Sequence, residues 1–139
     1  MRQTAVQFET NRRQFEGVVA QPDDMAGPVP GVVICLPGPP NGGNMDNNVV
    51  LALALGLVEN GFVTLRFNFR GVGGSQGVHT KGEKEYQEIL AALELIKAWP
   101  DTNDKTGLAG YSFGTSVILG HSELYSEADA IALVSPPFK

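Results

Sequence analysis

The sequence predicts an α/β protein, a three-layer α/β/α sandwich built on a mostly parallel sheet. From residue 31 onward, short apolar segments alternate with segments of helical period, which is the order of repeated strand–helix–strand units. The first apolar segment, GVVICLP at 31–37, is rich in β-branched residues and lacks polar alternation, as expected of a strand covered on both faces. The 17 glycines and 9 prolines indicate that tight turns join the elements.

A single domain over residues 1–139 is expected, since this length buries roughly two thirds of the surface that the unfolded chain exposes. Asn44 or Asp46 is expected to cap the first helix, and Gly61 to end it. Arg66 lies in an otherwise apolar strand segment, and the sequence offers no explanation for it. The expected strands are 15–22, 31–37, 62–69, 106–111 and 130–137, and the expected helices are 44–60, 83–98 and 113–124.

Composition excludes several functional classes. The net charge of −5, with scattered Lys and Arg, argues against a nucleic-acid or anionic membrane partner. Cys35 is the single cysteine, so we expect a buried thiol, no disulfide within the chain and no metal cluster of the Cys/His type. The N-terminus lacks the apolar core of a signal peptide, and no apolar run is long enough to cross a bilayer. These features predict a cytoplasmic protein.

The segment GLAGYSFGTSV places Ser112 in a Gly-x-Ser-x-Gly pattern, between the expected strand 106–111 and the expected helix 113–124. A turn this sharp strains the serine backbone, admits only small residues such as Gly110 and Gly114 on either side, and lifts the hydroxyl clear of the sheet. The N-terminus of the helix would favour negative charge, and the Phe113 N–H could donate to an oxyanion. Alternatively, the glycines only allow a close crossing of strand and helix.

Three loops are expected to share one rim of the sheet, because each leaves the carboxyl end of a parallel strand. They are the GPPNGG loop after 31–37, the glycine-rich loop 70–82 and the turn at Ser112. In the first loop the prolines have no N–H, so Gly38 is the nearest backbone donor that could complete an oxyanion hole. A plain rigid turn is the alternative interpretation of this loop.

Three segments in order resemble those of small bacterial serine hydrolases with the α/β-hydrolase fold. CLPGPPNGG resembles their H-P-H-P-L-x-G-G loop, LRFNFRGVGGSQG their R-F-N-F-R-G-V-G-x-S-x-G stretch, and GYSFG their G-x-S-x-G turn. The resemblance implies acyl-ester hydrolysis of a small substrate by Ser112, with the Gly38 and Phe113 N–H groups as the oxyanion hole and no metal or organic cofactor. Leu36 and Gly38 replace the two loop histidines, so no role for those imidazoles carries over.

The triad order of this fold is Ser, then Asp or Glu, then His. On that pattern both partners come after the strand that follows 130–135, so we expect a truncated α/β-hydrolase fold whose isolated chain is an impaired hydrolase. His121 is roughly 13 Å from Ser112 along one helix, too far to act as its base. Asp129 precedes a strand and belongs to the opposite rim. His79, in the 70–82 loop, is the remaining candidate for a surrogate base, with a solvated loop histidine as the alternative.

Two other functions compete with the hydrolase interpretation. A non-catalytic relic of the fold could act as an oligomeric or small-ligand-binding protein. A nucleotide-binding module is suggested by RGVGGSQG, although Gln76 stands where the third glycine of G-x-G-x-x-G is required. If the sheet ends at its last expected strand, the strand near Ala130–Ser135 would be an open edge. We expect a second copy, or a docked C-terminal segment, to cover it.

Overall fold

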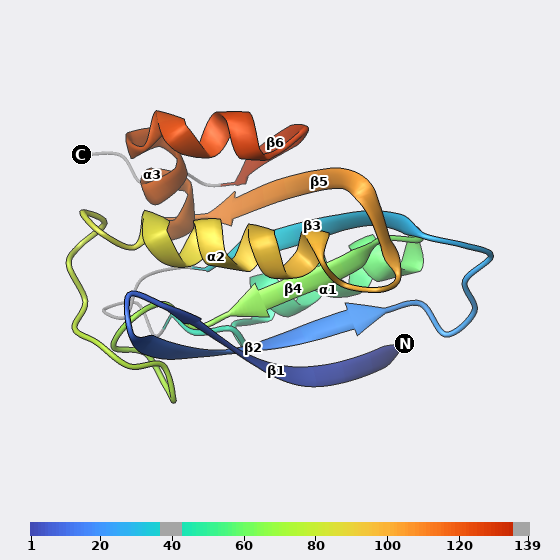
Figure 1. Cartoon of the computed structure of the whole chain (residues 1–139), viewed down its shortest axis with the longest axis horizontal. Coiled ribbons are helices and arrows are strands. Elements are labelled where there is room, and N and C mark those ends of the chain that lie inside the picture. Colours follow the sequence, from blue (N-terminus) through green and yellow to red (C-terminus); the bar gives the residue numbers. More distant parts are fainter. Residues whose placement is uncertain (37–42, 135–139) are drawn as a thin grey trace.

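The computed structural model describes residues 1–36 and 43–134. The predicted three-layer α/β/α architecture is confirmed (Figure 1). Along the chain the elements are β1 (Arg2–Thr10), β2 (Arg13–Gln21), β3 (Val29–Cys35), α1 (Asn48–Glu59), β4 (Val63–Phe67), α2 (Tyr86–Lys97), β5 (Thr102–Tyr111), α3 (Phe113–Gly120), the 3₁₀ helix η2 (Ser122–Glu127) and β6 (Ala130–Val134).

The described strands form a six-stranded sheet in the order β1-β2-β4-β3-β5-β6. The four strands from β3 onward are parallel, as their apolar runs predicted, whereas β1 and β2 form an antiparallel hairpin that pairs with β4. The carboxyl ends of β3, β4 and β5 therefore meet at one rim of the sheet. That rim carries the loops from which the sequence predicts a site.

Helices cover both faces of the sheet, which is why β3 is an almost continuous apolar run and every residue of β4 is buried. In the view of Figure 1, α2 crosses the near face and α1 lies behind the sheet. The helix α2 packs on β3, β5 and β1, while α1 packs on β4, β3 and β2. The helix α2 contributes fully buried side chains to the core, and so does β4. The largest of these side chains are Phe67, Leu65, Ile89, Leu93 and Ile96.

Three local expectations were wrong. The strand β1 was not expected; it joins β2 through Asn11 and Arg12, both at positive φ, in a two-residue turn without glycine. The cap of α1 is Asn47 rather than Asn44 or Asp46, and its Oδ1 accepts from the Val49 N–H at 2.9 Å. The helix after Ser112 ends at Gly120 instead of residue 124, where the tighter η2 takes over.

Arg66 now has a structural explanation. Its side chain, 7 % exposed, reaches from β4 to Gln3 Oε1 at 3.2 Å and to Asp46 Oδ1 at 3.7 Å. Burial lowers the pKa of this guanidinium, and the Asp46 carboxylate opposes that effect. Arg66 thus ties the first strand and the start of α1 to the middle of the sheet.

The strand β6 forms one edge of the sheet within the described part of the chain, and most of it is exposed. Ile131 and Leu133 are 37 % and 39 % exposed. Beside β6, an apolar groove of about 400 Å³ runs between the strand and α1, with Leu53, Leu57 and Phe62 among its walls. An exposed strand with apolar side chains is a ready site for further pairing or packing.

Candidate active site

The β5 bend, which we define as residues 110–114, connects β5 directly to α3. Ser112 is the one residue between the two elements, and its backbone has φ 54° and ψ −112°. An L-residue rarely adopts this conformation, so the surrounding structure must hold it. The Ser112 N–H donates to the Val134 carbonyl of β6 at 3.1 Å, and the Ser112 carbonyl accepts from the Ser116 N–H in α3.

Steric contacts explain the two glycines of the bend. A Cβ at Gly110 would lie 2.8 Å from Ile118 Cδ1 and 2.9 Å from the Thr115 nitrogen, and a Cβ at Gly114 would lie 2.5 Å from the Cys35 carbonyl oxygen. Real Cβ atoms do not approach backbone atoms this closely. The sequence argument for small residues on either side of Ser112 therefore has a specific cause, which is the close packing of α3 on the ends of β5 and β3.

The N-terminus of α3 leaves one amide free near Ser112. The Gly114 N–H donates to the Leu36 carbonyl at 3.0 Å. Within residues 1–36 and 43–134, the Phe113 N–H and the Ser112 hydroxyl have no hydrogen-bond partner. A free N–H at a helix N-terminus can stabilise negative charge. Gly38, the expected second donor, lies outside the described residues.

His79 lies against the first residue of α3. Its ring centroid is 5.0 Å from that of Phe113, which in turn meets Phe69 edge-on at 5.6 Å. A Cβ at Gly82 would also touch the Phe113 ring, so the segment around 79–82 packs over the start of the helix. The sequence analysis placed His79 on the same rim of the sheet as Ser112. In the structure its ring lies against Phe113, the residue that follows Ser112.

Glu85 is a buried residue beside His79 that the sequence analysis did not single out. It is fully buried and holds the segment before α2 by accepting from the Thr80 N–H at 2.7 Å, the Gly82 N–H at 3.0 Å and the Thr80 hydroxyl. Its Oε2 also lies 3.2 Å from His79 Nδ1. Burial alone would raise the pKa of Glu85, but the hydrogen bonds from Thr80 and Gly82 outweigh it and lower that pKa.

A second buried acid fixes the β4 loop, our name for residues 68–85. Arg70 and Glu88 are 4 % and 0 % exposed, and Arg70 Nη2 lies 2.6 Å from Glu88 Oε1. The Arg70 Nε donates to Glu88 Oε2 at 3.2 Å, which makes the pair bidentate. Burial raises the pKa of Glu88 despite the guanidinium. The two residues are 18 positions apart, and nothing in the sequence pairs them.

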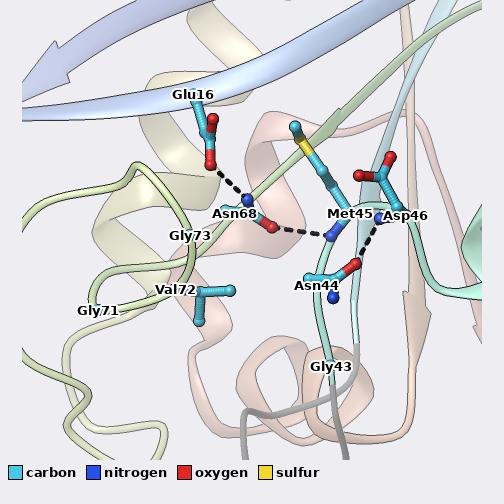
Figure 2. A pocket seen from close by; sticks show the side chains of 9 residues that line it. All are labelled: Glu16, Gly43, Asn44, Met45, Asp46, Asn68, Gly71, Val72 and Gly73. Carbon is cyan, nitrogen blue, oxygen red and sulfur yellow. Dashed lines mark hydrogen bonds between the residues drawn. The ribbon is translucent and has the colours of Figure 1, made fainter.

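An open pocket of about 500 Å³ lies beside the β4 loop and the segment that leads into α1. Figure 2 shows the hydrogen bonds that shape it: Asn68 donates to Glu16 Oε2 at 2.7 Å and accepts from the Met45 N–H at 2.8 Å. Asn68 therefore ties β2, the β4 loop and the residues before α1 to one another. The pocket is lined by Glu16, Gly43, Asn44, Met45, Asp46, Asn68, Gly71, Val72 and Gly73.

The other candidates from the sequence occupy structural positions. His121 caps α3, where its Nε2 is 2.9 Å from the Gly82 carbonyl and its ring stacks on Tyr86. Asp129 precedes β6 and accepts from the Thr106 N–H, on the rim opposite Ser112. Cys35 is buried, and burial raises the pKa of its thiol.

In the part of the chain that the structure describes, no group of three His, Cys, Asp or Glu side chains is arranged to hold a metal ion. None of the described helices combines the length and the apolar character that crossing a membrane requires.

Comparison with known proteins identifies relatives with this fold. A structure of an α/β serine hydrolase without a lid from Xanthomonas campestris is 32 % identical, with a TM-score of 0.86 over 97 % of this chain and 62 % of that one. An α/β serine hydrolase homologue from Coxiella burnetii is also 32 % identical, with a TM-score of 0.84 over 96 % of this chain and 63 % of its own. An uncharacterized protein of Rickettsia prowazekii is 32 % identical over 95 % of this chain and 55 % of its own length.

The chain thus spans a little over half to under two thirds of the length of these relatives. The sequence-based assignment to the α/β-hydrolase fold is confirmed by these structures. A family model described as X-Pro dipeptidyl-peptidase (S15 family) matches residues 10–138. The chain therefore belongs to the S15 family, a family of hydrolases with the α/β-hydrolase fold.

Proposed function

We propose that this protein is a serine hydrolase of the esterase type, with Ser112 as the nucleophile. The strained backbone of Ser112 is the observation that carries the proposal. Close contacts at Gly110 and Gly114 hold it between a strand and a helix N-terminus, with its hydroxyl free of other groups in the described structure. Strain of this kind is maintained where it serves a function.

The reaction proceeds in two steps. The Ser112 oxygen attacks the carbonyl carbon of a small acyl ester while a base takes its proton. The base gives that proton to the leaving oxygen, and the alcohol departs as the carbon–oxygen ester bond breaks. Water then attacks the acyl-enzyme, the bond from Ser112 to the acyl group breaks, and the carboxylic acid leaves as a proton returns to the Ser112 oxygen. The oxyanion formed in each step accepts a hydrogen bond from the Phe113 N–H. By the family resemblance it accepts a second one from the Gly38 N–H.

His79 is the base that this chain itself offers, because its ring lies against Phe113, the residue that follows Ser112. A serine without a fully assembled acid–base partner reacts slowly. Well-studied enzymes that lack triad members keep about 10³–10⁴-fold acceleration over water through the oxyanion hole and binding alone. We therefore expect weak activity from residues 1–139.

The same proposal includes a partner that packs on the exposed edge of β6. The exposed Ile131 and Leu133 and the groove beside α1 favour a second copy of the chain, or a docked C-terminal segment, over this edge. Light scattering after size-exclusion chromatography distinguishes the two. A dimer that Ile131→Lys dissociates supports the second copy. A monomer that binds a peptide from the C-terminal part of a relative supports the segment, and a monomer that binds neither contradicts both.

Hydrolysis of p-nitrophenyl acetate tests the function, with Ser112→Ala as the variant and Ser116→Ala as the matched control one turn further along α3. We expect the wild type and Ser116→Ala to release nitrophenol above the uncatalysed rate and Ser112→Ala to release it no faster than that rate. A chromogenic X-Pro dipeptide anilide, chosen from the name of the family, tests amide substrates in parallel. Equal rates for Ser112→Ala and wild type would overturn the proposal.

The second candidate is a non-catalytic protein that binds small acyl or carboxylate ligands at the same bend. The free Ser112 hydroxyl favours it, because no described base donates to or accepts from that oxygen. Binding of a carboxylate without turnover of either substrate would support this alternative.

A further inference from the structure

A buried carboxylate faces the imidazole that lies beside the α3 N-terminus. Glu85 is 0 % exposed, and the Thr80 and Gly82 donors fix both of its oxygens. It therefore lies in one defined position below His79. Its lowered pKa keeps it ionised at neutral pH.

The His79 ring presents one nitrogen to this carboxylate. Nδ1 is inaccessible to solvent and lies 3.2 Å from Glu85 Oε2, outside hydrogen-bond geometry, with no other partner among the described residues. The His79 side chain is 22 % exposed as a whole, but Nδ1 is not among its exposed atoms. A buried ring nitrogen is costly without a partner, and an anionic acceptor within a small ring rotation makes Nδ1 the protonated nitrogen.

The Phe113 ring limits the orientation further. It lies 5.0 Å from the imidazole and is itself held edge-on by Phe69. The imidazole is thus confined between a fixed carboxylate and a fixed aromatic ring. When Nδ1 carries the proton, Nε2 bears the basic lone pair.

We propose that Glu85 is a positioning residue, which holds His79 in the Nδ1–H tautomer and leaves Nε2 as the proton acceptor beside the N-terminus of α3. This inference rests on the proposed function of Ser112, and it adds the group that orients the base. Glu85 contacts neither substrate nor Ser112. It acts through the tautomer of His79 and through the Thr80–Gly82 segment that carries the ring over Phe113.

The tautomer in the wild-type protein is the first test. In ¹⁵N NMR of the neutral imidazoles, His79 is expected to show a protonated Nδ1 and an unprotonated Nε2. The variant His121→Gln leaves His79 as the only imidazole and assigns the signals. A wild-type His79 in the Nε2–H tautomer overturns the proposal. This measurement needs neither a substrate nor a variant at Glu85.

The second test compares Glu85→Gln with Ser75→Ala, which loosens the same β4 loop by removing the Ser75 hydroxyl bonds to Asn68 and Glu16 but keeps Glu85 and its donors. In Glu85→Gln the Nδ1–H tautomer is expected to be lost and the rate of nitrophenol release to fall by about 10²-fold or more, within the range that general base catalysis contributes. In Ser75→Ala both are expected to stay near wild type. Equal losses in the two variants would reduce Glu85 to a structural role and overturn the proposal.

The outcomes separate the two proposals. If Ser112→Ala and wild type hydrolyse the ester equally, the proposed function fails, whereas the His79 tautomer still decides whether Glu85 orients the ring. If Glu85→Gln does not fold, the wild-type tautomer alone decides.

Discussion

The β5 bend and the β4 loop both leave the carboxyl ends of parallel strands at one rim, yet they are held in opposite ways. Backbone contacts hold the β5 bend: Gly114 meets the Cys35 carbonyl, and the Ser112 hydroxyl binds no described group. Buried polar side chains hold the β4 loop, chiefly the Arg70–Glu88 pair and Glu85. Steric contacts hold the bend without using the Ser112 hydroxyl. In the β4 loop, the polar side chains that hold the backbone are themselves occupied by hydrogen bonds and ion pairs. The hydroxyl that is free to react therefore lies in the β5 bend, and the polar network that supports the rim lies in the β4 loop.

The largest effect is expected from breaking the ion pair. Arg70→Met leaves the fully buried Glu88 carboxyl without its partner, which costs about 3–5 kcal/mol in the free energy of unfolding. Urea denaturation measures this change. The double variant Arg70→Met/Glu88→Leu should recover much of the loss, because an apolar pair replaces the buried charges. A cost below about 1 kcal/mol for the single variant would show that the β4 loop does not depend on this pair.

Overpacking the bend is expected to have the next largest effect. In Gly114→Ala the new methyl group would lie 2.5 Å from the Cys35 carbonyl oxygen, so α3 must shift at a cost of about 1–3 kcal/mol. Gly120→Ala, at the other end of α3 with open space around it, is the matched control and should be neutral or slightly stabilising. If denaturation gave the two variants equal stability, close packing would not be what holds Ser112.

A smaller effect is expected from Gly73→Ala in the β4 loop. Gly73 has φ +53°, which costs an L-residue about 1–2 kcal/mol, and its Cβ would lie 2.5 Å from Glu16 Oε2. The new methyl group would also lie 2.6 Å from Asn68 Nδ2. Both contacts are with the ends of side chains rather than with backbone, so the loop should yield more easily than the bend. Gly27→Ala, with nothing within 4 Å, is the control. A cost for Gly73→Ala larger than that for Gly114→Ala would reverse the ranking of the two regions.

The smallest effect is expected in the pH dependence of stability. The folded protein lowers the pKa of Glu85, so Glu85 stabilises the fold above its unfolded pKa of about 4.5, and this contribution is lost as pH falls through the folded pKa. Glu88 has a raised pKa and acts in the opposite direction. Unfolding of Glu85→Gln between pH 3 and pH 6 should therefore show a weaker loss toward acid than wild type. The same slope in both proteins would contradict this assignment.

The sequence predicts the parallel strands and the bend at Ser112 because periodicity and glycine spacing are local signals. It does not predict β1, whose alternation of Val6 and Phe8 with polar residues was a readable strand signal. Nor does it predict the pairing of Arg70 with Glu88, because separation along the chain carries no information about which charges meet. The cap of α1 was misplaced since NMDNN offers several candidate side chains, and only the backbone geometry selects Asn47.

The reactivity of Ser112 is the most direct test of this structural explanation. The protein is incubated with a fluorophosphonate, and peptide mass spectrometry locates the adduct in wild type, Ser112→Ala and Ser116→Ala. We expect a single phosphonyl group on Ser112 in wild type and in Ser116→Ala, and none in Ser112→Ala. A folded protein that stays unlabelled, or one labelled at Ser116 or elsewhere, would contradict the view that the bend holds an activated nucleophile.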